Sequence, residues 1–116
     1  MLDISAEEFE RYVDEAVESV PAALLDLVEN CILVIEDEPP LGEPHLLGLY
    51  QGVPLDRRGI DYSGVLPDRI LIFRTPLMRM CRTPAELREQ VRVTVVHEIG
   101  HFFGIDDARL HELGYA

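Results

Sequence analysis

Apolar residues near the N-terminus recur every three or four positions, which is the spacing of an amphipathic helix. The motif SAEE places Ser5 as an N-cap and Glu8 three residues later, so together they form a capping box. The pattern therefore predicts a helix over about residues 5–19. Pro21 then suits the first turn of a short second helix over residues 21–30, PAALLDLVEN.

Three short runs rich in branched and aromatic residues are typical of strands. They are CILVIED, LLGLYQGVP and DRILIFR, at residues 31–37, 46–54 and 68–74. The first run is the best candidate for a central strand. Two turn-rich segments, EDEPPLGEPH and DRRGIDYSGVLP, separate the three runs and are predicted to be surface connections.

The last part of the chain is predicted to be mostly helical. TPLMRMC, at residues 75–81, has room for one helical turn or two. TPAE begins a long helix, with Thr83 as the N-cap, Pro84 at the first helical position and Glu86 completing a capping box. This helix carries VTVVHEIGHFFG, and a last short helix, DARLHELG, follows it.

Length and composition are those of one folded domain spanning residues 1–116, because 47% of the residues are hydrophobic and 28% charged. The net charge of -12 repels phosphate backbones and anionic surfaces, so neither nucleic acid nor a membrane is expected as a partner. No secretion signal or membrane-spanning run is recognisable, which favours a cytoplasmic protein. In that compartment Cys31 and Cys81 are expected to be free thiols.

The long C-terminal helix is apolar nearly all round except for one polar stripe. Gln90, Thr94, His97 and His101 share this face, with Glu98 at its margin. His97 and His101 are one helical turn apart, so each can aim a nitrogen at the same metal ion. Glu98 is offset toward the open coordination position, where its carboxylate can accept a proton from water.

A catalytic zinc ion usually has three protein ligands and keeps one position for water. Gly104 suits a left-handed helix end, after which the chain can turn back and present Asp106 or Asp107. The other interpretations of Asp106 are a cap for the last helix or a hydrogen-bond partner behind a ligand histidine.

The sequence favours a position away from the site for four further polar residues. Glu112 is close in sequence for a later carboxylate ligand, and His111 or Tyr115 could donate to an oxyanion, although surface positions are favoured for both. His45 lies in the proline-rich loop, and nothing in the sequence places it near a metal.

HEIGHFFGIDD matches H-E-x-x-H-x-x-G-x-x-D, and through it the chain resembles the Asp-zincins, a group of zinc metallopeptidases. More closely it resembles the small bacterial zincin-like domains called mini-zincins, a likeness that extends through LLGLYQGVPL, SGVLPDRI and LREQVRVTVVHEIGHFFGI. The resemblance implies an α/β (α+β) fold with the active-site helix under a small mixed sheet. It puts His97, His101 and Asp107 on the ligand positions of one zinc ion and Glu98 on the catalytic position, so Asp107 is favoured over Asp106.

The function that this resemblance implies is hydrolysis of peptide bonds in a peptide or protein substrate. Glu98 would deprotonate a zinc-bound water, which attacks the carbonyl, and would pass the proton to the leaving amine. Extended substrate would pair with an edge strand from LLGLYQGV or DRILIFR. Two alternatives remain open. The domain could be a non-catalytic metal-binding or protein-interaction module, or it could hold no metal, with His97 and His101 as core histidines.

Overall fold

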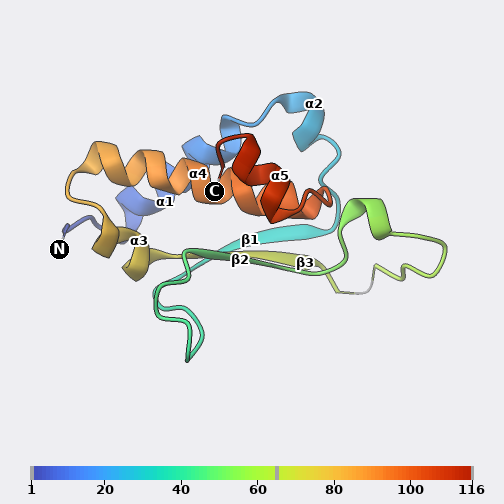
Figure 1. The fold of residues 1–116 in the computed structure, drawn as a ribbon, viewed down its shortest axis with the longest axis horizontal. Coiled ribbons are helices and arrows are strands. Elements are labelled where there is room, and N and C mark those ends of the chain that lie inside the picture. The colour runs from blue at the N-terminus through green and yellow to red at the C-terminus, as the bar shows by residue number, and fades with distance from the viewer. Residues whose placement is uncertain (1, 65, 116) are drawn as a thin grey trace.

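A three-stranded mixed sheet is the frame on which the helices pack (Figure 1). The computed structural model describes residues 2–64 and 66–115. The strands are β1 (Cys31–Glu36), β2 (Gly48–Gln51) and β3 (Asp68–Phe73). The central strand, β3, pairs in parallel with β1 and antiparallel with β2. The mixed α+β architecture expected from the resemblance is therefore confirmed.

The central strand is β3, so the preference for residues 31–37 was wrong. All residues of β3 except Arg69 are buried, whereas every residue of β1 is half-buried or exposed. An apolar run indicates a strand but does not show which strand has two partners. Strand β3 also begins with a buried charged residue, Asp68, which is unusual for a central strand.

Two long helices, α1 (Ala6–Glu18) and α4 (Pro84–Phe102), lie side by side over one face of the sheet (Figure 1). Both begin where the capping motifs predict. Ser5 Oγ accepts a hydrogen bond from the Glu8 amide, and Thr83 Oγ1 accepts one from the Glu86 amide, each at 3.1 Å. The capping residues therefore fix the residue at which each helix begins, and with it which side chains face the core.

The core lies between these two helices and the sheet. Its fully buried members each contribute roughly 1.5–3 kcal/mol of apolar burial. They include Phe9, Ile72, Leu77, Leu87, Val91 and Val95. Because α4 uses one side for this core, only its remaining faces are available to a site.

The remaining elements are short and comprise α2 (Ala22–Leu25), a 3-10 turn (Leu55–Arg57), α3 (Arg74–Met80) and α5 (Asp107–Glu112). Of the predicted short helices, α2 and α5 are shorter than residues 21–30 and 107–114, whereas α3 forms the two helical turns for which TPLMRMC has room. The second helix is a single turn, and the chain reaches β1 through Asn30, which has a positive φ of 51°. Strand β2 is short because Gly52 turns the chain at φ 150°, where a Cβ would lie 2.1 Å from the Asp68 side chain.

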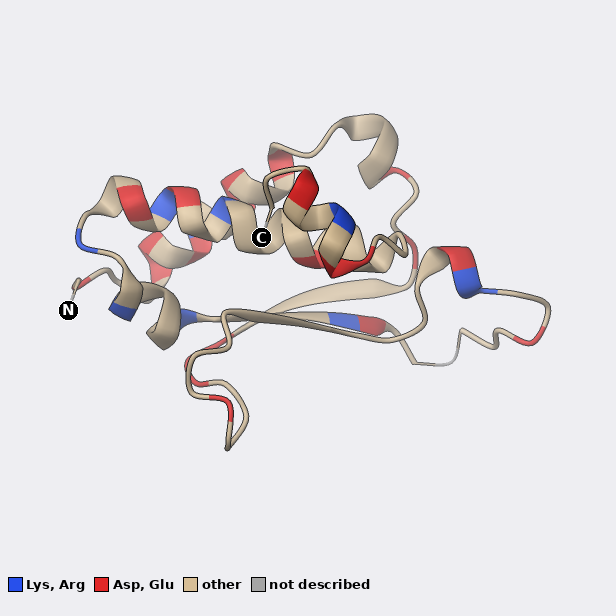
Figure 2. Cartoon of the chain, in the orientation of Figure 1, with Lys and Arg blue, Asp and Glu red and all other residues tan. Residues whose placement is uncertain are grey.

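Charged residues are interspersed over the helices and the loops (Figure 2). Both cysteines are free, Cys31 half-buried and Cys81 buried, which confirms the expectation for the thiols. Within residues 2–64 and 66–115, no helix combines the length and the apolar character that crossing a membrane requires.

Candidate metal centre and its flanking cavities

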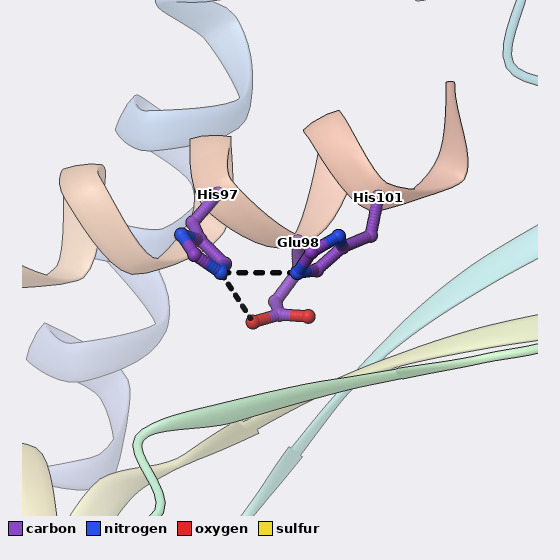
Figure 3. A group of neighbouring side chains, drawn as sticks. All are labelled: His97, Glu98 and His101. Carbon is purple, nitrogen blue, oxygen red and sulfur yellow. Dashed lines mark hydrogen bonds and ion pairs between the residues drawn. The ribbon is translucent and has the colours of Figure 1, made fainter. Parts of the chain in front are cut away.

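The C-terminal half of α4 presents His97, Glu98 and His101 toward the sheet (Figure 3). Because the helix is unbroken from Pro84 to Phe102, the two histidines lie on the same face, one turn apart. Their ring centroids are 4.7 Å apart and their Nε2 atoms 3.0 Å apart. The helical spacing thus brings one nitrogen of each ring to a common point.

The other ring nitrogens are held by backbone carbonyls. His101 Nδ1 lies 3.0 Å from the Ile105 oxygen, and His97 Nδ1 contacts the Tyr115 oxygen. A carbonyl can only accept, so both neutral rings carry their proton on Nδ1 and donate it. The lone pair of each ring is then on Nε2, the atom that points at the other histidine.

Asp107 is the first residue of α5 and brings a carboxylate to the same point. Its Oδ1 lies 3.2 Å from His97 Nε2 and 2.9 Å from His101 Nε2. The chain reaches this position because α4 is closed by Gly104 at φ 88°, with the Ile105 amide donating to the Gly100 carbonyl at 3.0 Å. The left-handed turn predicted from the sequence is present.

The donor set fits a zinc ion. Two imidazole lone pairs and a carboxylate oxygen converge with mutual separations between 2.9 and 3.2 Å. These acceptors repel one another unless a cation binds to them. Ligand atoms arranged tetrahedrally at zinc bond lengths are roughly 3.3 Å apart, close to the observed spacing. The set of two nitrogens and one oxygen is also one that zinc enzymes use.

Glu98 lies beside the two Nε2 atoms, slightly farther from them than Asp107. Its side chain is buried, with Oε2 4.0 Å from His97 Nε2, and it forms a potential ligand group with the two histidines. Burial is the main cause that raises the pKa of Glu98 above its ordinary value, while the histidines and a hydrogen bond from the Tyr50 backbone act in the opposite direction. A buried carboxylate with a raised pKa is well suited to accept a proton.

Strand β2 passes very close to α4 at Glu98. A Cβ on Gly48 would lie 2.9 Å from Thr94 Cγ2 and 3.1 Å from Glu98 Cγ, so only glycine permits this approach without a shift. Since β2 pairs only with β3, it is an edge strand of the sheet. Of the two candidate edge strands, DRILIFR is excluded because it forms the centre.

Two cavities flank the converging atoms. One, of about 270 Å³, is lined by His97, Glu98 and Thr94 of α4 and by residues 45–48. This cavity also includes His45, a position that nothing in the sequence indicated.

The other cavity, of about 260 Å³, is lined by residues that include His101, Asp107, Tyr50 and Arg57. Neither His45 nor Arg57 belongs to a recognisable motif. Their positions depend on how two loops fold back toward α4.

The competing candidates have other roles. Asp106 is the N-cap of α5 and accepts a hydrogen bond from the Arg109 amide at 2.9 Å. Glu112 forms an ion pair with Arg109 at 2.9 Å, and His111 is exposed. Tyr115 reaches the site through its carbonyl, as the acceptor for His97. The structure therefore brings together His97, Glu98, His101 and Asp107, and it places Asp106 in the capping role.

An HExxH helix beneath a mixed sheet, with a carboxylate returning from beyond the helix end, is the arrangement that zinc peptidases use. The family model of zincin-like metallopeptidases matches residues 28–115. The chain belongs to the zincin-like metallopeptidase family, as the resemblance indicated. Membership implies zinc binding and peptide or protein substrates at the level of the family. No curated protein matches the chain significantly.

Proposed function

We propose that the protein is a zinc-dependent peptidase that binds one zinc ion through His97, His101 and Asp107. The observation that carries this proposal is the convergence of three lone-pair atoms whose histidines are already oriented by carbonyl acceptors.

When bound, zinc supplies a Lewis acid that lowers the pKa of water and polarises a peptide carbonyl. Glu98 accepts the proton of the attacking water and donates it to the leaving amide nitrogen. Its burial suits both steps, because a raised pKa strengthens it as a base and leaves it able to return the proton. His97 and His101 keep their protons on Nδ1, where each donates a hydrogen bond to a backbone carbonyl.

The substrate is an extended peptide that adds to the free edge of β2. Strand addition uses main-chain hydrogen bonds, and Gly48 brings this strand against Glu98, so a paired peptide passes the proposed base. The cavities on either side then receive neighbouring side chains of the substrate.

The test compares Glu98→Gln with the wild-type chain and with Glu112→Gln, whose carboxylate is exposed and ion-paired. Zinc stoichiometry and hydrolysis of a quenched fluorescent peptide library are measured for all three proteins. Glu98→Gln is expected to keep zinc and to lose at least a hundredfold in turnover, whereas Glu112→Gln behaves as wild type.

Unchanged turnover in Glu98→Gln would refute the mechanism. Zinc binding without hydrolysis by the wild-type chain would favour a non-catalytic module instead. If the chain binds no zinc and chelator leaves its melting temperature unchanged, then the metal site itself is wrong.

A further inference from the structure

The acceptors that orient the two histidines lie on one short segment, residues 105–115. Ile105 precedes α5 and holds His101, while Tyr115 follows α5 and holds His97. The same segment carries the Asp107 carboxylate. Residues 105–115 therefore supply the carbonyl acceptors of both histidines and the carboxylate that meets their Nε2 atoms.

A left-handed turn returns the chain to His97 after α5. Gly114 has φ 90°, its amide donates to the His111 carbonyl at 3.1 Å, and the Tyr115 amide donates to the Leu110 carbonyl at 2.8 Å. Leu110 is buried against Gly100 of α4, where a Cβ would lie 2.6 Å from Leu110 Cδ2. The turn is thus anchored on the helix that carries the histidines.

The Tyr115 ring is held by α4 as well. The guanidinium of Arg92 lies 5.7 Å from the centroid of this ring, within the range of a cation–π contact. Arg92 is itself fixed by Glu89, at 3.0 Å between Nε and Oε2. Side chain and backbone together hold the Tyr115 carbonyl where His97 Nδ1 can donate to it.

We propose that Tyr115 is a positioning residue of the metal centre, its carbonyl fixing the ring orientation and the tautomer in which His97 offers Nε2 to zinc. The inference rests on the proposed zinc site. If the carbonyl moves away, His97 can turn or carry its proton on Nε2, and that nitrogen no longer binds metal. Loss of such an outer partner typically weakens metal binding ten- to a hundredfold.

Gly114→Ala tests this, with Gly42→Ala as its matched control. Both glycines have φ 90° and open space within 4 Å of the point where a Cβ would lie, so the substitutions impose the same backbone strain without a clash. Only Gly114 lies next to the acceptor of His97. Zinc affinity of the full chain is measured by competition with a chromophoric chelator. The tautomers of His97 and His101 in the metal-free protein are read from imidazole nitrogen NMR shifts.

Gly114→Ala is expected to bind zinc about tenfold more weakly or worse and to lose the Nδ1-protonated signature of His97. Gly42→Ala should retain both properties. Equal zinc affinity and equal His97 shifts in the two variants would overturn the proposal. If the wild-type chain binds no zinc, the proposed function fails, and the tautomer comparison alone then decides whether Tyr115 positions His97.

A second pair of variants applies if Gly114→Ala does not fold. Arg92→Met removes the contact with Tyr115, and Arg88→Met removes the similar contact with Tyr12, at 5.0 Å, elsewhere on α4. Zinc affinity is expected to fall about two- to fivefold in Arg92→Met and to stay unchanged in Arg88→Met. Identical affinities in these two variants would contradict the positioning role.

Discussion

The loop that carries Arg57 to the cavity beside His101 and Asp107 is anchored by a buried ion pair between Arg58 and Asp68. The Arg58 Nη2 and Asp68 Oδ2 atoms are 2.7 Å apart, and the two side chains are 7% and 3% exposed. Asp68 also accepts hydrogen bonds from the Tyr50 hydroxyl and, at 3.2 Å, from the Val53 amide. Replacing Asp68 with Asn preserves the shape of the side chain but leaves the Arg58 charge buried without its counter-ion.

The cost follows from that uncompensated charge. Breaking a buried pair by neutralising one partner destabilises a protein by about 3–5 kcal/mol. Arg58 keeps hydrogen bonds to the Val53 and Glu29 carbonyls, at 2.9 and 2.8 Å, and contacts with the Tyr62 and Phe102 rings. We therefore expect the lower end, about 3 kcal/mol, which corresponds to a melting temperature about 12 °C lower for a domain of this size.

Urea unfolding of Asp68→Asn measures the change, with Asp37→Asn as the control. Asp37 also forms an ion pair with an arginine, Arg74, at 3.0 Å, but its side chain is 75% exposed. Exposed pairs contribute about 0–1 kcal/mol, so the control should barely move the midpoint. If Asp68→Asn costs no more than Asp37→Asn, the pair does not anchor the loop and the reasoning is refuted.

Two further predictions follow from the same geometry. Burial alone would raise the pKa of Asp68, but its hydrogen bonds and the nearby guanidinium outweigh it and lower the pKa below 3.8, so stability should be lost as the pH falls through that depressed value. Acid unfolding of the wild-type protein should show this loss. If Asp68→Asn leaves the dependence of stability on pH unchanged, the prediction is wrong. Gly48→Ala forces a Cβ against Thr94 and Glu98, so it should lower the free energy of unfolding by about 1–3 kcal/mol and reduce peptidase activity. Thermal melts and turnover measure the two effects. A variant equal to wild type in both would show that the close approach is dispensable.

The starts of the two long helices and the turn that ends α4 could be predicted because their signals are local. Ser5 and Thr83 cap helices through bonds to amides three residues away, and Gly104 ends α4 through its own backbone conformation. The spacing of His97 and His101 is also a property of one helix. All of these features depend on neighbours in sequence, which the sequence shows directly.

The order of the strands and the surroundings of the site depend on distant partners. Asp68 is buried at the start of the central strand because Arg58, from the loop before it, pairs with its charge, and no local pattern in the sequence indicates that pair. His45 reaches the cavity beside Glu98 only because β2 docks on α4. The acceptor of His97 is a backbone carbonyl, and a carbonyl has no signature in a sequence.

The site divides into two parts that the chain builds separately. The proposed ligands and the carbonyls that orient them all come from α4 and residues 105–115. The sheet contributes the close passage of Gly48 and the Tyr50 backbone bond to Glu98. Because the connections before and after β2 line part of each flanking cavity, changes there can alter which peptide fits without disturbing the proposed ligands. Selectivity for substrate should therefore reside in residues 45–57, and metal affinity in the helical part of the site.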